Sequence, residues 1–228
     1  MSEWMTYRLS DFLMFSPSTY FRQFELYNAD VWPAHIMTLT LGAACLWLSR
    51  QPIAAPQRAL PAILAGCWLW VAWGYLYTRY ATINWAASYF AGALVLQAIL
   101  LFLVGTFGKK LEFGGPIQRA QKAGIAIFLI AMIVQPLIGV IAGRPWVEAE
   151  VFGLAPNPTV AATLGLLLAA RRWRWELFVI PALWCGIDGA TRLAMEAPDF
   201  WVMPVVAILV IGLAVAASID RRRAARQL

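Results

Sequence analysis

Seven long apolar runs divide this chain of 228 residues, with short polar segments between them. A helix needs about 20 apolar residues to cross the hydrocarbon core of a bilayer, and all but one of the runs reach about that length. The pattern therefore predicts an all-α membrane protein with seven transmembrane helices. The predicted spans are residues 31–49, 59–78, 85–107, 123–143, 157–170, 175–194 and 200–218.

Lys and Arg are concentrated in every second segment between the runs. These alternate segments hold 13 of the 18 basic residues, namely Arg50, Arg58, Lys109, Lys110, Arg119, Lys122, Arg171, Arg172, Arg174, Arg221, Arg222, Arg223 and Arg226. The other segments hold 5, which are Arg8, Arg22, Arg79, Arg144 and Arg192. Because cytoplasmic loops carry the Lys and Arg excess, we expect a multi-pass membrane protein with the N-terminus outside and the C-terminus in the cytoplasm.

The chain is expected to divide into three parts. Residues 30–219 form the seven-helix membrane domain, and residues 220–228 form a basic cytoplasmic tail. Residues 1–29 form an outer interfacial segment, in which Ser16 can cap a helix that has Pro17 at its first position. One face of that helix is aromatic, with Tyr20, Phe21, Phe24 and Tyr27. Since the segment is amphipathic, we expect it to lie along the outer surface without spanning.

Composition excludes several classes of protein. Charged residues make up 13% of the chain, where a soluble domain has about 25%, and the runs leave no room for a separate soluble domain. The net charge of +6 comes largely from the predicted cytoplasmic loops, so the expected partner is the lipid bilayer and no nucleic acid. The cysteines, Cys45, Cys67 and Cys185, each lie inside an apolar run without a close pair, which argues against a disulfide scaffold or a thiolate metal site.

The fourth run carries two signals about its helix. Gln135 precedes Pro136, and a proline inside a helix removes a hydrogen bond and produces a kink. Gly139 and Gly143 have the G-x-x-x-G spacing, which permits close contact with another helix. We expect that contact to be internal packing in preference to a partner.

The fifth run is short. From residue 157 to residue 170 it covers about 21 Å at a helical rise of about 1.5 Å per residue, less than the roughly 30 Å hydrocarbon core. The preceding segment, 148–159, must therefore enter the protein from the outer side, since irregular backbone at that depth is tolerated only inside protein or beside a cavity. Asn157 can cap the fifth helix, with Pro158 at its first position.

Asp188 is the strongest single candidate for a binding residue. It lies within the sixth run, and a carboxylate inside a membrane usually faces the protein interior and marks a functional site. Gly186 and Gly189 flank it, so another backbone can approach closely. An ion pair with Arg192, four residues later, would neutralise it locally. The sequence thus leaves Asp188 either as a ligand or proton site, or as one half of an ion pair.

The other candidate ligands for a solute or ion are Glu148, Glu150, His35, Asn157 and Thr159. We expect the segment before the fifth helix to bring at least one of its two glutamates near Asp188, where close carboxylates would share a proton or a cation. His35, the only histidine, is the expected further member from the first span. The alternative is that Arg144 or Arg192 neutralises these carboxylates and the segment is only a plug.

Motifs of catalysis are missing from the sequence. There is no phosphate-binding loop, no H-E-x-x-H and no G-x-S-x-G. With one histidine and no paired cysteines, we expect no metal site, and the last run has no lysine for a retinal Schiff base. We therefore predict a protein that has no cofactor and no catalytic residues and is not an enzyme.

Three stretches carry a resemblance to a known family. They are YRLSDFLMFSPSTY at 7–20, NADVWPAH at 28–35 and EVFGLAPNPTVAATLG at 150–165. The chain resembles, over essentially its whole length, an uncharacterised bacterial multi-spanning membrane family, which is catalogued as a domain of unknown function and loosely labelled permease-like. The resemblance implies a bacterial inner-membrane protein and supplies no site residues.

Two functions remain open. In the first, the protein binds, and could transport, a small solute or cation through an outward-facing polar pocket. In the second, it is a non-catalytic membrane subunit or scaffold of a larger complex, with another membrane protein or a second copy of itself as partner. Convergence of the polar residues on one enclosed cavity would favour the first function, and dispersed polar residues beside a flat apolar face would favour the second.

Overall fold

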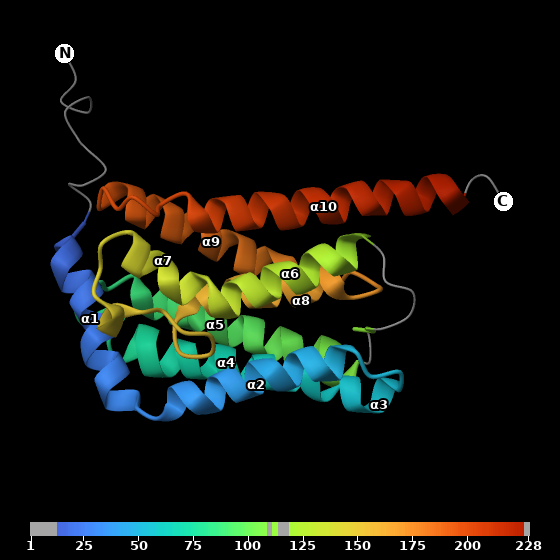
Figure 1. Cartoon of the computed structure of the whole chain (residues 1–228), viewed down its shortest axis with the longest axis horizontal. Coiled ribbons are helices and arrows are strands. Elements are labelled where there is room, and N and C mark those ends of the chain that lie inside the picture. Colours follow the sequence, from blue (N-terminus) through green and yellow to red (C-terminus); the bar gives the residue numbers. More distant parts are fainter. Residues whose placement is uncertain (1–12, 109–110, 114–118, 226–228) are drawn as a thin grey trace, which may run out of the picture.

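The structure is a computed structural model that describes residues 13–108, 111–113 and 119–225. Within those residues it is all-helical (Figure 1). The helices are α1 (Pro17–Val31), α2 (Ala34–Ser49), α3 (Ala54–Gln57), α4 (Ala59–Trp70) with its π-helical extension η3 (Val71–Tyr77), η4 (Tyr80–Thr82), α5 (Ala87–Leu100) with its π-helical extension η5 (Leu101–Phe107), α6 (Arg119–Ile133), α7 (Gln135–Ile141), η6 (Trp146–Glu148), α8 (Pro156–Ala169), α9 (Glu176–Ala194) and α10 (Val202–Ala225).

Helix α8 is the centre of the bundle. All 14 of its residues are buried, and α4, α6, α9 and α10 pack around it. The closest approach is to α6, where a Cβ built on Gly165 would lie 2.7 Å from the carbonyl oxygen of Gly124. A Cβ on Gly124 would lie 2.4 Å from the carbonyl oxygen of Gly165. The two backbones are therefore in direct contact, and neither position has room for a side chain.

The expected contact through Gly139 and Gly143 is wrong. Helix α7 ends at Ile141, and Gly143 has φ +87° in the turn that follows. That left-handed conformation is one that glycine adopts without steric cost, so Gly143 ends the helix instead of packing it. Gly139 faces the guanidinium of Arg144, which its own Cβ would approach to 3.1 Å.

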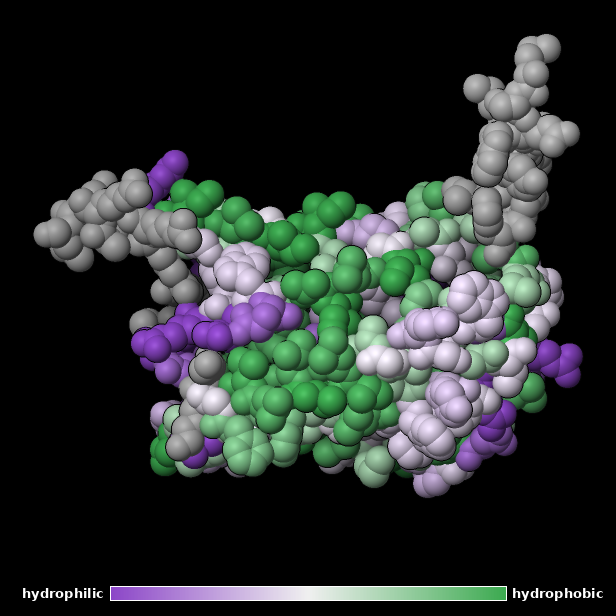
Figure 2. All heavy atoms as spheres, turned by 180° about the vertical axis from the view of Figure 1, so that it is seen from behind, coloured by the Kyte–Doolittle hydropathy of each residue, from purple (hydrophilic) through white to green (hydrophobic). Residues whose placement is uncertain are grey.

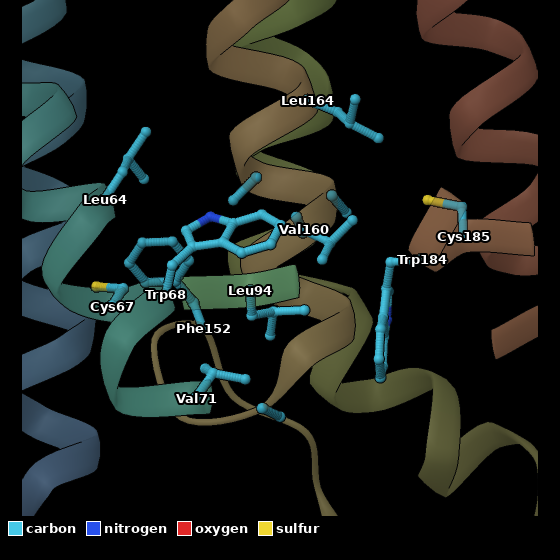
Figure 3. Close-up of a cluster of buried hydrophobic side chains, with 14 of the residues drawn as sticks. Leu64, Cys67, Trp68, Val71, Leu94, Phe152, Val160, Leu164, Trp184 and Cys185 are labelled. Atoms are coloured by element: carbon cyan, nitrogen blue, oxygen red, sulfur yellow. The ribbon is translucent and has the colours of Figure 1, made fainter. Parts of the chain in front are cut away.

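Tryptophans from two neighbouring helices pack around α8 (Figure 3). Trp68 of α4 donates from Nε1 to Thr163 Oγ1 at 2.9 Å, and Trp184 of α9 donates from Nε1 to Asn157 Oδ1 at 2.8 Å. Phe152, from the segment before α8, is fully buried in the same core. The surrounding core is largely apolar, so each indole N–H is paired where it meets a polar side chain of α8.

Helix α1 lies across one end of the bundle, upright at the left of Figure 1, and makes an angle of 90° with α2. We call this end the α1 end. As predicted, Ser16 caps the helix, accepting from Thr19 N at 3.2 Å, and Pro17 is at the first position. Its aromatic face is buried against the protein: Phe24 stacks on Tyr75 at 4.6 Å between centroids. α1 is therefore a lid on the bundle.

Several helices are long and apolar enough to cross a membrane. Four qualify singly: Ala54–Thr82, Ala87–Phe107, Glu176–Ala194 and Val202–Asp220. The number rises to six if each bent pair is one span, the pairs being α1 with α2 and α6 with α7. The second pair bends by 52° beside Pro136, which confirms the predicted kink. Apolar side chains also cover much of the outside of the helices (Figure 2), as expected for a membrane protein.

Candidate functional site

Five charged side chains meet inside the protein at the α1 end. Arg192 and Asp188 come from α9, Asp199 from the loop between α9 and α10, and Arg144 and Glu150 from the segment between α7 and α8. Their side chains are 2 to 13% exposed. We call these residues, Arg144, Glu150, Asp188, Arg192 and Asp199, the charge cluster.

Arg192 is the hub of the charge cluster. Its Nε donates to Asp188 Oδ1 at 3.0 Å, and its Nη1 donates to Asp199 Oδ2 at 2.6 Å. Its Nη2 donates to Glu150 Oε1. A guanidinium presents its donors in a fixed planar fork, so a single arginine holds a helix residue and two loop residues in place. Arg192 is itself in the last turn of α9.

Arg144 closes the other side of the charge cluster. It binds Asp199 with two hydrogen bonds, from Nη1 to Oδ1 at 3.1 Å and from Nη2 to Oδ2 at 2.6 Å. Paired bonds of this kind are among the stronger ones in proteins. The guanidinium also lies over the ring of Phe21 on α1, 4.2 Å from its centroid. Helix α1 therefore covers the charge cluster with an aromatic face that suits cations.

The charge cluster is unbalanced. It contains three carboxylates and two guanidinium groups, so its formal charge is negative when all are ionised. Among the described carboxylates of the charge cluster, two oxygens accept no hydrogen bond: Glu150 Oε2, and Asp188 Oδ2, which lies 3.0 Å from Arg192 Nε as an ion pair. Buried charged groups are normally fully paired because the loss of hydration is costly. The site therefore has capacity for one more group that carries positive charge or donates hydrogen bonds.

Asn157 connects the charge cluster to α8. Its Nδ2 donates to Asp188 Oδ1 at 3.0 Å, while its Oδ1 accepts from Trp184. The indole thus fixes the amide so that its N–H faces the carboxylate. The predicted capping role is wrong: α8 begins at Pro156, Ala155 is the capping residue, and no side chain caps the helix. Asn157 lies inside the first turn, which turns its side chain toward α9.

A small cavity borders the charge cluster. Its volume is about 10 Å³, by a measure in which one water molecule needs about 10–15 Å³. All five cluster residues and Asn157 line it. Gln135 and Ile138 of α7 and Val202 and Met203 of α10 complete the wall. A compact group about the size of water is the largest that fits without movement of the walls.

Burial and charge move the two loop carboxylates in opposite directions. Burial raises the pKa of Glu150, and the charge of Asp188 adds to this effect, while Arg192 opposes it. Burial also acts to raise the pKa of Asp199, but the hydrogen bonds from Arg144 and the charge of Arg192 outweigh it, and the pKa is lowered. Asp199 is thus the fixed anion of this pair, and Glu150 accepts a proton more readily than Asp199 does.

The structure separates the other predicted ligands from this site. Glu148 is partly exposed in η6, and burial raises its pKa. Thr159 holds the backbone before α8, accepting from Gly153 N at 2.8 Å and donating to Ala155 O at 2.7 Å. His35 bonds to Asn28 at 3.2 Å and lines a different, apolar groove of about 520 Å³ with Trp32 and Trp146.

Asp199 is not among the candidates that the sequence predicted. Its contacts depend on the loop that reverses the chain between α9 and α10, where Glu196 has φ 56° and Ala197 N donates to Arg192 O at 2.9 Å. A signal was present in the spacing, since Asp199 follows Arg192 by less than two helical turns of chain. Metal binding gains no support: within the described residues, no group of three or more His, Cys, Asp or Glu could hold a metal ion.

Comparison with known proteins gives one match. A family described as a family of unknown function (DUF6064) matches residues 18–225, so the chain belongs to that family. No curated protein matches the chain, and no solved structure matches it. The residues of the charge cluster all fall inside the matched range.

Proposed function

We propose that this member of the DUF6064 family is a multi-spanning membrane protein that binds a small cation with N–H donors, such as a primary ammonium group, at the charge cluster. One observation carries the proposal. Glu150 Oε2 is buried without a hydrogen-bond partner in the described protein, and Asp188 Oδ2 accepts no hydrogen bond although it lies 3.0 Å from Arg192 Nε; both residues line the same small cavity.

The proposed topology has seven crossings, with the α1 end outside. The distribution of basic residues supports this orientation, because Arg50 ends α2 and Arg171 follows α8, and both helices end away from α1 (Figure 1). The fifth crossing combines the short α8 with the buried segment at 152–155 that precedes it. Buried backbone of this kind is compatible with a membrane only when protein surrounds it.

Charge and size together favour an ammonium group. A single positive charge would balance the excess carboxylate, and an ammonium donates several charge-assisted hydrogen bonds, which suit two free carboxylate oxygens. Its head is close in size to the water molecule that the cavity accommodates. A proton on Glu150 is the competing way to balance the charge, and it would leave Asp188 alone of the two proposed carboxylate ligands. Binding should therefore weaken on acidification.

The proposed function is binding of the cation, and transport across the membrane is not part of it. The middle of the bundle is packed with apolar side chains around α8 (Figure 3), and that packing offers a hydrated ion no support on the way to the other end. Transport would need rearrangement of this core as well as displacement of α1, so binding is the part of the function that the geometry supports.

The test measures binding of methylammonium chloride to the purified protein in lipid nanodiscs by calorimetry, at constant ionic strength. We expect saturable binding, and none for tetramethylammonium, which has no N–H donor and is too large for the cavity. Glu150→Gln should weaken binding at least tenfold, since a hydrogen bond to a charged group contributes about 1.5–3 kcal/mol. Glu148→Gln is the matched control and should change nothing. Equal binding by wild type and both Glu150→Gln and Asp188→Asn would refute the site.

A membrane subunit or scaffold is the second candidate, and one observation favours it. The groove of about 520 Å³ at the α1 end is lined by Trp32, Trp146 and Val147, whose side chains are 64, 60 and 51% exposed. Such a patch of exposed aromatic and aliphatic groups is typical of an interaction surface. A cysteine introduced in place of Trp146 would then react with maleimide in the purified protein and be protected in native membranes.

A further inference from the structure

A second cavity adjoins the charge cluster and differs from it in character. It has a volume of about 150 Å³ by the same measure and lies between α6, α7 and α10, with Ala161 of α8 beneath it. Apart from Gln135 its lining is apolar, and it includes Ile127, Val206 and Leu209. We call it the α6–α10 groove.

The two cavities are adjacent and share three lining residues. Gln135, Ile138 and Val202 line both of them. Gln135 lies where the chain bends between α6 and α7, and its Nε2 donates to Met203 Sδ at 3.1 Å. A thioether sulfur is a weak acceptor, so this amide is held loosely and could turn to a better partner. The side chain between the two cavities is thus polar and can exchange its hydrogen-bond partner. The rest of the lining of the α6–α10 groove is apolar.

The α6–α10 groove opens on the apolar outer surface of the bundle. Ile130 and Leu209 on its rim are 51 and 52% exposed. In the proposed topology this surface faces lipid, so a molecule would enter the groove from the bilayer and not from water. The groove therefore connects the hydrocarbon phase with a buried site that needs a positively charged, hydrogen-bond-donating group.

From this adjacency we propose that the ligand is a primary alkylammonium, an amphiphile whose ammonium head binds at Glu150 and Asp188 and whose unbranched hydrocarbon tail lies in the α6–α10 groove. The inference rests on the proposed function and adds the tail, the lipid side as the route of entry, and Gln135 as the residue at the junction. Amphiphiles with a carboxylate head are disfavoured, because the charge cluster already contains an excess of carboxylates.

The experiment compares methyl-, butyl- and hexylammonium in nanodiscs. Burial of a methylene contributes about 0.8 kcal/mol, so affinity should rise about threefold to fourfold per methylene that the groove covers. Val206→Phe, which fills the groove, should abolish the rise while methylammonium still binds. Val205→Phe is the matched control, since Val205 is the neighbouring valine on α10 and does not line the groove. Partitioning into lipid is equal in the two variants and cancels.

A second pair of variants removes side-chain volume instead of adding it, so that an effect on binding is not confused with misfolding. Leu209→Ala removes part of the rim and should weaken hexylammonium at least threefold, whereas Ile208→Ala, exposed on the same helix outside the groove, should not. Three results would overturn the inference while methylammonium still binds. They are an equal rise with chain length in both valine variants, no rise in wild type, or hexanoate binding as tightly as hexylammonium. If methylammonium did not bind to the wild-type protein, the proposed function itself would be overturned instead.

Discussion

The two ends of α8 lie in different kinds of interior. Around its middle and C-terminal half the neighbours are apolar, and Gly165 meets the backbone of α6 without room for a methyl group. Around its first turn, Asn157 meets a network of buried charges whose members come from loops as well as helices. Shape specifies the first region and charge balance specifies the second. The first should be sensitive to added volume, and the second to the removal of a single charge.

The largest effect is expected from removing the hub of the charge cluster. Arg192→Met leaves three buried carboxylates with only Arg144, and breaking a buried network in this way costs about 3–5 kcal/mol. Arg79→Met provides the contrast, because its pair with Asp30 is 37 and 57% exposed and should contribute at most about 1 kcal/mol. Reversible unfolding in mixed detergent measures both. Similar losses for the two variants would show that charge balance does not specify this end.

A second comparison concerns volume. Gly165→Ala places a methyl group 2.7 Å from a backbone oxygen of α6, and separation of the two helices should cost about 1–3 kcal/mol. Gly66→Ala, in α4 with no atom near the added carbon, should be neutral or stabilise by about 1 kcal/mol through helix propensity. The unfolding midpoints of the two variants measure this difference in stability. If Gly165→Ala were as stable as Gly66→Ala, the contact between α6 and α8 would be looser than described.

Helix α1, the lid, should contribute less to the free energy of unfolding than the Arg192 network or the contact between α6 and α8. Phe21→Leu keeps an apolar side chain on α1 and removes the ring beneath Arg144, which should cost about 0.5–2 kcal/mol. Phe21→Tyr keeps the ring and should restore most of the loss. Thermal unfolding of the three proteins checks the order. A stable Phe21→Leu variant would mean that the lid acts by coverage alone.

The smallest expected effect is the dependence of stability on pH. Because the pKa of Glu150 is raised on folding, the folded state holds its proton more tightly. The resulting stabilisation is complete below the ordinary glutamate pKa of 4.5 and is lost as pH rises through the raised pKa. Glu150→Gln should flatten this decline in melting temperature above pH 4.5.

Asp199 should change the dependence of stability on pH in the opposite direction to Glu150. Its pKa is lowered from 3.8, so its stabilisation is complete above that value and is lost as pH falls through the lowered pKa. Asp199→Asn should therefore flatten only the acid limb of the curve. A single set of melting curves across both limbs compares the two variants. If Glu150→Gln flattened the acid limb instead, the assignment of the two carboxyls would be reversed.

Much of the helical structure was predictable because it depends on local patterns. The apolar runs gave helices within a few residues of α2, α5 and α9, and the Gln135-Pro136 pair predicted the bend. The shortness of the fifth run also predicted that at least one of Glu148 and Glu150 would come near Asp188, because the backbone before that run had to be buried; in the structure Glu150 and Asp188 share Arg192. Those inferences needed only helix geometry and the thickness of a bilayer.

The remaining features depend on how separate segments meet. The Gly124–Gly165 contact joins two runs that carry no paired signal in the sequence, whereas the visible G-x-x-x-G ends at a turn. Asp199 reaches Arg192 through a loop whose path no periodicity describes. His35 is directed to another groove by the 90° bend between α1 and α2. Such contacts are set by tertiary packing, which local propensity does not encode.

The position of α1 has a consequence for biogenesis. It is the first described helix to leave the ribosome, yet it packs on Tyr75 and Tyr80, and it lies over Arg144. In the proposed topology, its aromatic face has no packing partner until Tyr75 and Tyr80 have been synthesised. The charge cluster itself is complete only when Asp199 has been synthesised. Docking of the lid is thus tied to near-completion of the chain, so a truncated product would expose unpaired charges and aromatic surface to quality-control proteases.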